Sequence, residues 1–201
     1  PTVARLKCVC RLRWHSVGVE PIQVSRENHA TSRVDPRVLA ALLPEFTGQY
    51  GNAASRQHFF GQKAEGAVGL ARGQVAELSG AEARTIVFTS GATESNNLAL
   101  LGLAPEGERL GRRQIVSTQI EHKAVLEPLA ALERRGFEVT LVPPTRGGWV
   151  DPDALFAAIG PHTLLVSVMQ ANNETGVIQP ISEVADGLAD RSDAYLHVDA
   201  A

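Results

Sequence analysis

The chain has 201 residues, of which 44% are hydrophobic, so it can bury a sizeable core and one domain is the natural expectation. Nineteen basic and 22 acidic residues leave a formal net charge of −3, which argues against a nucleic-acid or polyanion binder. No apolar run reaches the length of a membrane span, so we expect a soluble protein with no membrane association.

Residues 1–24 form a basic leader with no clean helical or strand period, and we expect them to be irregular. The remnant of a targeting segment or a fragment boundary would both explain them. Cys8 and Cys10 lie here, and no other cysteine exists to complete a metal site or a disulfide framework. We therefore interpret them as incidental thiols, expect no metal, and favour a cytoplasmic location.

From residue 35 onward, helical and strand patterns alternate. Asp35-Pro36 opens a helix with an N-cap aspartate and a proline at the first helical position. A long apolar-periodic helix follows and is closed by Gly80. The elements expected next are strand 85–89, helix 93–104, strand 114–118, helix 123–135, strand 137–142, a helix from 151 to about 159, strand 164–169, helix 181–190 and strand 195–199. This order predicts an α/β fold, with a mostly parallel sheet covered by helices on both faces.

Residues 86–97 read Ile-Val-Phe-Thr-Ser-Gly-Ala-Thr-Glu-Ser-Asn-Asn and combine a β-rich run, a glycine turn and a helix start. Such a turn aims free backbone N–H groups and the positive end of the helix dipole at one point, which suits a phosphate. Ser90, Thr93 and Ser95 add hydroxyls near that point. Taken alone, an ordinary strand–helix turn with a hydroxyl N-cap explains the segment equally well.

Polar groups follow four of the expected strands, in segments 90–93, 119–122 and 172–174 and at Asp199. The carboxyl ends of parallel strands share one edge of a sheet, where ligands bind in such folds. A phosphate cup, a histidine, an asparagine pair and a strand-end aspartate together suit pyridoxal phosphate (PLP). The aspartate would keep the pyridine nitrogen protonated, and the histidine could stack on the ring and move protons.

The residues also resemble those of a known family. The blocks that carry the resemblance are Asn28-His29-Ala30-Thr31, Val34-Asp35-Pro36-Arg37, Gly51-Asn52, Ser55-Arg56, His58 with Phe60-Gly61, residues 86–97, Glu121-His122-Lys123-Ala124-Val125-Leu126, Asn172-Asn173-Glu174-Thr175-Gly176 and His197-Val198-Asp199-Ala200-Ala201. On these blocks the chain resembles the cysteine desulfurases of the class V aminotransferase group, which are PLP-dependent enzymes of fold type I. The resemblance implies that residues 25–201 are part of the PLP-binding large domain, ending before the lysine that holds PLP and before the C-terminal small domain.

The resemblance implies a role for five residues. Ala92 and Thr93 would contact the PLP phosphate, and His122 would stack on the pyridine ring and take part in acid–base steps. Asn173 would contact cofactor or substrate, and Asp199 would pair with the pyridine nitrogen. A substrate-side role is implied for Asn28, His29, Arg56 and His58.

The implied reaction converts L-cysteine to L-alanine and passes the sulfur to an enzyme cysteine as a persulfide, for iron–sulfur cluster or thio-cofactor assembly. The resemblance further implies a homodimer and leaves room for sulfur-acceptor or scaffold proteins as partners. Lys7, Lys63 and Lys123 are the only lysines, and none matches the PLP-binding lysine. Neither cysteine matches the nucleophile, so we expect the 201 residues alone to be inactive.

Two alternatives remain open. One is a different enzyme of the same class, either selenocysteine lyase or another class V aminotransferase-like enzyme. The other is a non-catalytic half-domain that acts by binding or by pairing with an intact subunit. The Glu121–Leu126 block favours the desulfurase, and the expected open sheet edge favours a fragment over a complete product.

Overall fold

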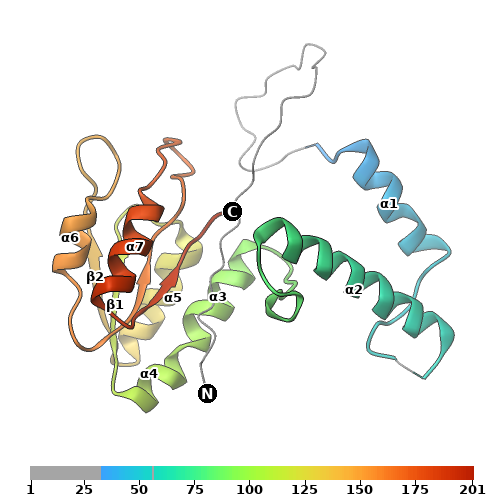
Figure 1. The fold of residues 1–201 in the computed structure, drawn as a ribbon, viewed down its shortest axis with the longest axis horizontal. Coiled ribbons are helices and arrows are strands. Elements are labelled where there is room, and N and C mark those ends of the chain that lie inside the picture. Colours follow the sequence, from blue (N-terminus) through green and yellow to red (C-terminus); the bar gives the residue numbers. More distant parts are fainter. Residues whose placement is uncertain (1–32, 56) are drawn as a thin grey trace, which may run out of the picture. The chain divides into compact units, whose positions relative to one another are not determined.

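The computed structural model describes residues 33–55 and 57–201, which fall into two compact units divided between Val87 and Phe88 (Figure 1). Each unit is described by itself. The expectations for residues 1–24, Asn28, His29 and Arg56 lie outside the described residues. The domain boundary expected at residue 25 likewise stays a prediction.

The first unit contains two α-helices, and the predicted start of the first and the predicted end of the second are confirmed. Helix α1 (Pro36–Thr47) starts at Asp35, whose carboxylate accepts the N–H of Arg37 at 2.8 Å. Helix α2 (Phe59–Ser79) ends at Gly80, which takes a left-handed conformation with φ 66°. A short 3-10 helix η1 (Ala83–Thr85) follows.

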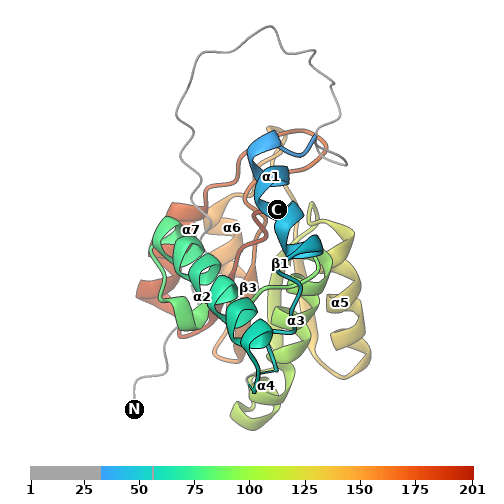
Figure 2. The ribbon, with the colours of Figure 1, turned by 90° about the vertical axis from the view of Figure 1, so that its right-hand side faces the viewer.

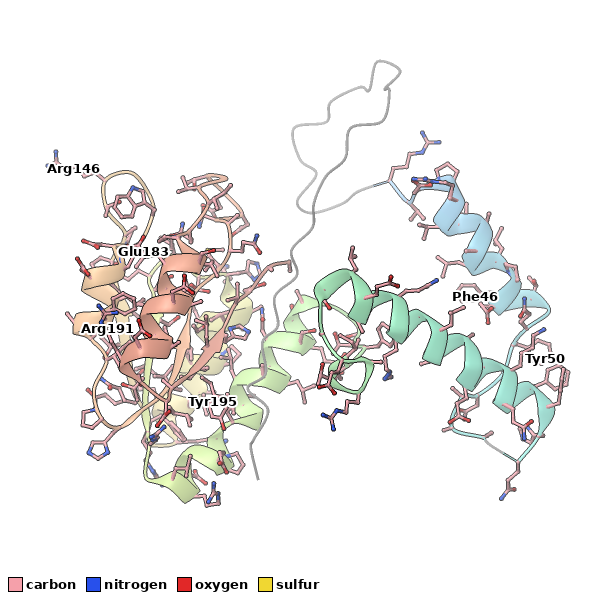
Figure 3. The ribbon with its side chains drawn as sticks, in the orientation of Figure 1. Phe46, Tyr50, Arg146, Glu183, Arg191 and Tyr195 are labelled. Atoms are coloured by element: carbon pink, nitrogen blue, oxygen red, sulfur yellow. The ribbon has the colours of Figure 1, made fainter. Side chains whose placement is uncertain are left out.

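The apolar faces of α1 and α2 are largely exposed in the described part of the chain. Phe46 and Tyr50, labelled in Figure 3, are 78% and 64% exposed. Only Gly61, Ala64 and Ala76 of α2 are buried, and α1 has no buried residue. The helical periodicity therefore predicted the secondary structure correctly, although few of these side chains reach a core in this unit.

The strand predicted at 85–89 is wrong. Ile86 has extended dihedral angles (φ −82°, ψ 126°), but no strand among the described residues pairs with the segment. Val87 and Phe88 are 64% and 49% exposed, so their side chains are not buried as those of a central strand are. The β-rich segment is therefore part of the connection between the two units and belongs to no sheet among the described residues.

The second unit is built on a four-stranded parallel sheet in the order β2-β1-β3-β4. The strands are β1 (Gln114–Thr118), β2 (Glu138–Val142), β3 (Thr163–Ser167) and β4 (Tyr195–His197). All residues of β3 are buried, as its uninterrupted apolar run predicts for a central strand covered on both faces. The parallel sheet is therefore confirmed.

Helices cover both faces of this sheet (Figure 2). On one face, α3 (Ala92–Gly102), α4 (Ala104–Leu110) and α5 (Lys123–Arg134) pack on a core that includes Ile115 and Leu165. On the other, α6 (Pro152–Ala157) and α7 (Ile181–Arg191) pack on Val116 and Val166. Alternate strand residues thus enter two separate cores, which confirms the three-layer α/β/α architecture.

Two local details complete the unit. Helix α4 follows α3 directly and was not predicted: the helix expected at 93–104 corresponds to α3, and no element was expected between residues 104 and 114. On α7, Arg191 lies over the ring of Phe156 with 4.7 Å to its centroid and so joins α7 to α6 (Figure 3). Among the described residues, no helix is both long and apolar enough to cross a membrane.

Candidate functional site

The start of α3 offers unused backbone donors. Gly91 precedes the helix, and the N–H groups of Ala92 and Thr93 find no acceptor in the described part of the chain. A side chain on Gly91 would meet nothing within 4 Å, so the space beside it is open. Two free N–H groups at the positive end of an 11-residue helix, with the Thr93 hydroxyl beside them, form a suitable anion site.

The other hydroxyls of this segment are already engaged. The hydroxyls of Thr89 and Ser95 lie 2.6 Å apart, and that of Thr89 also donates to the carbonyl of Gly91 at 3.1 Å. Glu94 accepts the N–H of Ser90 at 2.6 Å, and hydrogen bonding from the Ser90 side chain and backbone lowers the pKa of Glu94. These contacts fix the turn and leave the backbone N–H groups of Ala92, Thr93 and Glu94 without an acceptor among the described residues.

His122 is the N-cap of α5. Its Nδ1 accepts the N–H of Ala124 at 3.1 Å, so a neutral ring carries its proton on Nε2, and the side chain is otherwise exposed. His122 therefore has a structural role at the start of α5. Capping also fixes the ring and leaves its faces and Nε2 free to contact a ligand.

Glu121 is buried directly before this histidine. Its Oε1 accepts the hydroxyl of Thr118 at 2.6 Å and the N–H of Met169 at 2.9 Å, which ties the end of β1 to the end of β3. Its Oε2 is buried and has no partner among the described residues. Burial raises the pKa of Glu121 to about 7, and the nearby charge of Asp199 acts in the same direction.

Asn172 organises the loop after β3. Its Oδ1 accepts the N–H groups of Glu174 and Thr175 at 3.1 and 2.9 Å, and its Nδ2 donates to the carbonyl of Ile120 at 3.1 Å. The loop is thereby bound to the segment that carries His122. Asn173, the residue expected to contact the ligand, is exposed in this turn.

Asp199 ends the segment that follows β4 and is half-buried. Its Oδ2 accepts the side-chain N–H of Asn96 at 2.9 Å, and its Oδ1 accepts the N–H of Ala201 at 3.2 Å. The backbone carbonyl of Asp199 accepts the N–H of Gln170 at 2.7 Å, beside the loop of Asn172. This carboxylate keeps lone pairs for a further donor, as a pyridine N–H would be.

These hydrogen bonds connect the segments that carry Thr93, His122, Asn173 and Asp199 at the carboxyl end of one sheet. His58 is the exposed N-cap of α2 and belongs to the other unit, so its substrate-side role stays a prediction. Sequence reasoning assigned no role to Asn96 or His197, although both lie in segments that it quoted. Burial of polar side chains, which a single sequence does not reveal, is the signal that distinguishes them.

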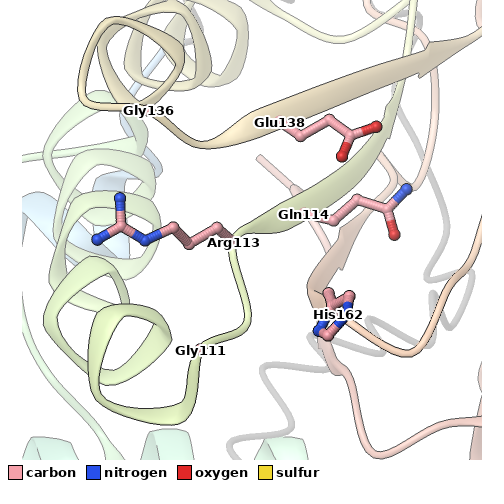
Figure 4. Close-up of a pocket in the computed structure, with 6 residues that line it drawn as sticks. All are labelled: Gly111, Arg113, Gln114, Gly136, Glu138 and His162. Carbon is pink, nitrogen blue, oxygen red and sulfur yellow. The ribbon is translucent and has the colours of Figure 1, made fainter.

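A hollow lies at the opposite edge of the sheet (Figure 4). Its lining residues lie just before the strands or at their first positions, and they are Gly111, Arg113, Gln114, Gly136, Glu138 and His162. The amide of Gln114 is already hydrogen-bonded to Gly160 and to the carbonyl of Ala158. This hollow is open and lies away from the polar strand ends, so we do not assign the site to it.

The chain belongs to the class V aminotransferase family, whose model matches residues 26–201. Within that class its relatives are cysteine desulfurases. It is 54% identical over 179 residues to the cysteine desulfurase IscS of Anaeromyxobacter sp. (strain K), covering 89% of this chain and 44% of that protein. It is 50% identical over 172 residues to the cysteine desulfurase of Mus musculus, covering 86% of this chain and 37% of that protein.

Solved structures agree with this relationship. DndA from Streptomyces lividans matches with a TM-score of 0.78 and 53% identity, covering 86% of this chain and 48% of that one. SspA in complex with cysteine matches with a TM-score of 0.80 and 37% identity, covering 86% and 49%. The fold is thus the PLP-dependent transferase fold type I. The chain spans less than half the length of these relatives.

Proposed function

We propose that this chain supplies the PLP-binding part of a cysteine desulfurase. The observation that carries the proposal is the direct hydrogen bond between Asp199 and Asn96, because it joins a carboxylate to the helix whose first turn offers a phosphate site. PLP needs this pair of groups, an anion site for its phosphate and a carboxylate for its pyridine nitrogen. The residues present therefore fit the cofactor.

Each residue has a defined task in this proposal. The N–H groups of Ala92 and Thr93, with the Thr93 hydroxyl, bind the phosphate, and Asp199 accepts the pyridine N–H. His122 stacks on the ring, oriented by its bond to Ala124. Its Nε2 carries a proton and is positioned to donate it. Asn173, at the exposed turn, contacts cofactor or substrate.

When bound, PLP supplies an electron sink for the carbon next to the substrate amine. The proposed substrate is L-cysteine, because the solved structure of the related SspA is a complex with cysteine. In the net reaction the carbon–sulfur bond of cysteine breaks, a thiol of the enzyme gains the sulfur as a persulfide, and L-alanine leaves. A homodimer, a sulfur-accepting partner protein and a cytoplasmic location belong to the same proposal.

The test uses the natural protein that contains this chain, at its full length. We expect it to bind PLP in competition with inorganic phosphate and to form alanine from L-cysteine, with sulfide released when dithiothreitol is added to reduce the persulfide. Selenocysteine, offered in parallel, distinguishes a lyase specific for that substrate. Failure to bind PLP would refute the proposal, and binding without turnover of cysteine would refute the assignment as a desulfurase.

Two variants locate the cofactor. Thr93→Val removes one hydrogen bond to a charged phosphate and should weaken PLP binding about tenfold to a hundredfold. Asp199→Asn should lower the rate of alanine formation by at least about tenfold, because the amide cannot hold the pyridine nitrogen protonated. Asp190→Asn, an exposed aspartate on α7, is the matched control and should leave both measurements unchanged.

A further inference from the structure

Three polar side chains that the proposed reaction does not use form a continuous chain of hydrogen bonds to Asp199. Asn96 donates from Nδ2 to Asp199 Oδ2 at 2.9 Å. The Oδ1 of Asn96 lies 3.1 Å from Nε2 of His197, and Nδ1 of His197 lies 2.9 Å from the hydroxyl of Ser167. The chain thus runs from the core of the sheet, at the end of β3, to the carboxylate at the site.

Chemistry fixes the direction of these bonds. An ionised carboxylate only accepts, so the amide of Asn96 must turn its NH₂ group toward Asp199. The carbonyl oxygen of Asn96 then faces His197 and requires a proton on Nε2. With a neutral ring, Nδ1 accepts the hydroxyl proton of Ser167. Every donor in the chain therefore points toward Asp199.

Burial supports the neutral ring and gives the chain its strength. Asn96 is 4% exposed and Ser167 is fully buried. Burial lowers the pKa of His197, although the charge of Asp199 opposes this shift. Hydrogen bonds of this kind are stronger in an interior than in water, and an unpaired buried polar group is costly. The side chains of Asn96, His197 and Ser167 are therefore held in a single hydrogen-bonded conformation.

The chain also links the two halves of the proposed cofactor site. Asn96 lies three residues after Thr93 on α3, so both residues belong to nearly the same face of the helix. The helix start contacts the phosphate, and one turn later the same helix holds the carboxylate for the pyridine nitrogen. A single rigid element sets both contacts.

We propose that Asn96 and His197, anchored by Ser167, are positioning residues that keep the Asp199 carboxylate aimed at the pyridine nitrogen of PLP. This inference rests on the proposed function. Without the bond from Asn96, the carboxylate is free to rotate away from the ring nitrogen. The hydrogen bond between Asp199 and the ring nitrogen is then weaker, so the nitrogen holds its proton less firmly and the ring becomes a weaker electron sink.

The first experiment needs no cofactor. In the full-length apoprotein, ¹⁵N NMR of labelled histidine should show His197 with a proton on Nε2 and none on Nδ1 at neutral pH. Ser167→Ala should shift the Nδ1 signal, because that nitrogen loses its donor. A proton on Nδ1 alone would overturn the proposal, since the chain would then run in the wrong direction.

The second experiment measures the ring nitrogen of bound ¹⁵N-labelled PLP. In Asn96→Leu and His197→Phe, we expect its signal to move toward that of an unprotonated pyridine and PLP affinity to fall about tenfold. His197→Gln, which retains a donor, should recover part of the shift. Asn97→Leu, at the neighbouring position of α3, is the matched control. A role in packing alone would lower stability without moving this signal.

The outcomes separate this proposal from the one it rests on. If the wild-type protein does not bind PLP, the proposed function fails and this inference fails with it. If PLP binds but the ring nitrogen signal is the same in wild type, Asn96→Leu and His197→Phe, only the positioning role is overturned. Should Asn96→Leu not fold, the same comparison is made with His197→Gln and Ser167→Ala.

Discussion

Replacing Glu121 with glutamine should remove a large pH dependence of stability. Glu121 is 6% exposed, and burial raises its pKa from 4.5 to about 7. The folded protein therefore holds the Glu121 proton more tightly than the unfolded chain does. The stability that this proton contributes is complete below pH 4.5 and is lost as the pH rises through 7.

The size of the effect follows from the pKa shift. One pKa unit corresponds to about 1.4 kcal/mol, so raising the pH from 5 to 8 should lower the free energy of unfolding by about 2–3 kcal/mol through this group. Glu121→Gln keeps an oxygen for Thr118 and Met169 but carries no proton to lose. The glutamine variant should match the wild type near pH 5 and exceed it by about that amount at pH 8.

The assay is urea unfolding of the full-length apoprotein at pH 5, 6, 7 and 8. At each pH, the free energy of unfolding of the variant is compared with that of the wild type. Other titrating groups, His197 among them, cancel in this difference. Glu127→Gln, on the exposed side of α5, is the matched control and should show no such trend. A wild-type-to-variant difference that is constant from pH 5 to pH 8 would refute the reasoning.

Three further changes test other parts of the unit. His122→Ala should cost about 1 kcal/mol of unfolding free energy through loss of the α5 cap; His122→Asn should restore the cap but not the rate of alanine formation. Asn172→Ala should speed amide hydrogen exchange in the loop that follows it, whereas Asn173→Ala should not; equal rates in both would contradict the bracing role. Leu132 is fully buried, so Leu132→Ala should lower the free energy of unfolding in urea titrations by about 2–5 kcal/mol. Leu98 is 55% exposed, so Leu98→Ala should lower it by about 0.5 kcal/mol or less.

The sequence predicted most helices and strands of the second unit to within a few residues, because their signals are local. Strand β1 was placed at its observed bounds, and the N-cap of α6 at Asp151 is confirmed. The expected strand at 85–89 failed because a strand requires a partner, and composition does not say whether one is present. Helix α4 was missed because its seven residues include Pro105 and Gly107, which disfavour a helix in sequence, although a proline in the first turn is tolerated.

Some residues of the candidate site could likewise be predicted from local sequence, and others could not. The helix start at Ala92 and the strand-end Asp199 were found because turn residues and strand ends are visible in sequence. Asn96 and His197 were not, because their importance comes from a hydrogen bond across 101 positions of sequence. Only the folded structure, which places α3 beside the end of β4, reveals that contact.

Helix α3 makes the site tolerant of one kind of sequence change and intolerant of another. Substitutions at its exposed positions, such as Leu98, leave its axis and register unchanged. An inserted or deleted residue between Thr93 and Asn96 would turn Asn96 by about 100° and shift it by about 1.5 Å along the axis. The amide would then miss Asp199 altogether. The site therefore depends on the three-residue spacing between Thr93 and Asn96 more than on the identity of the exposed side chains of α3.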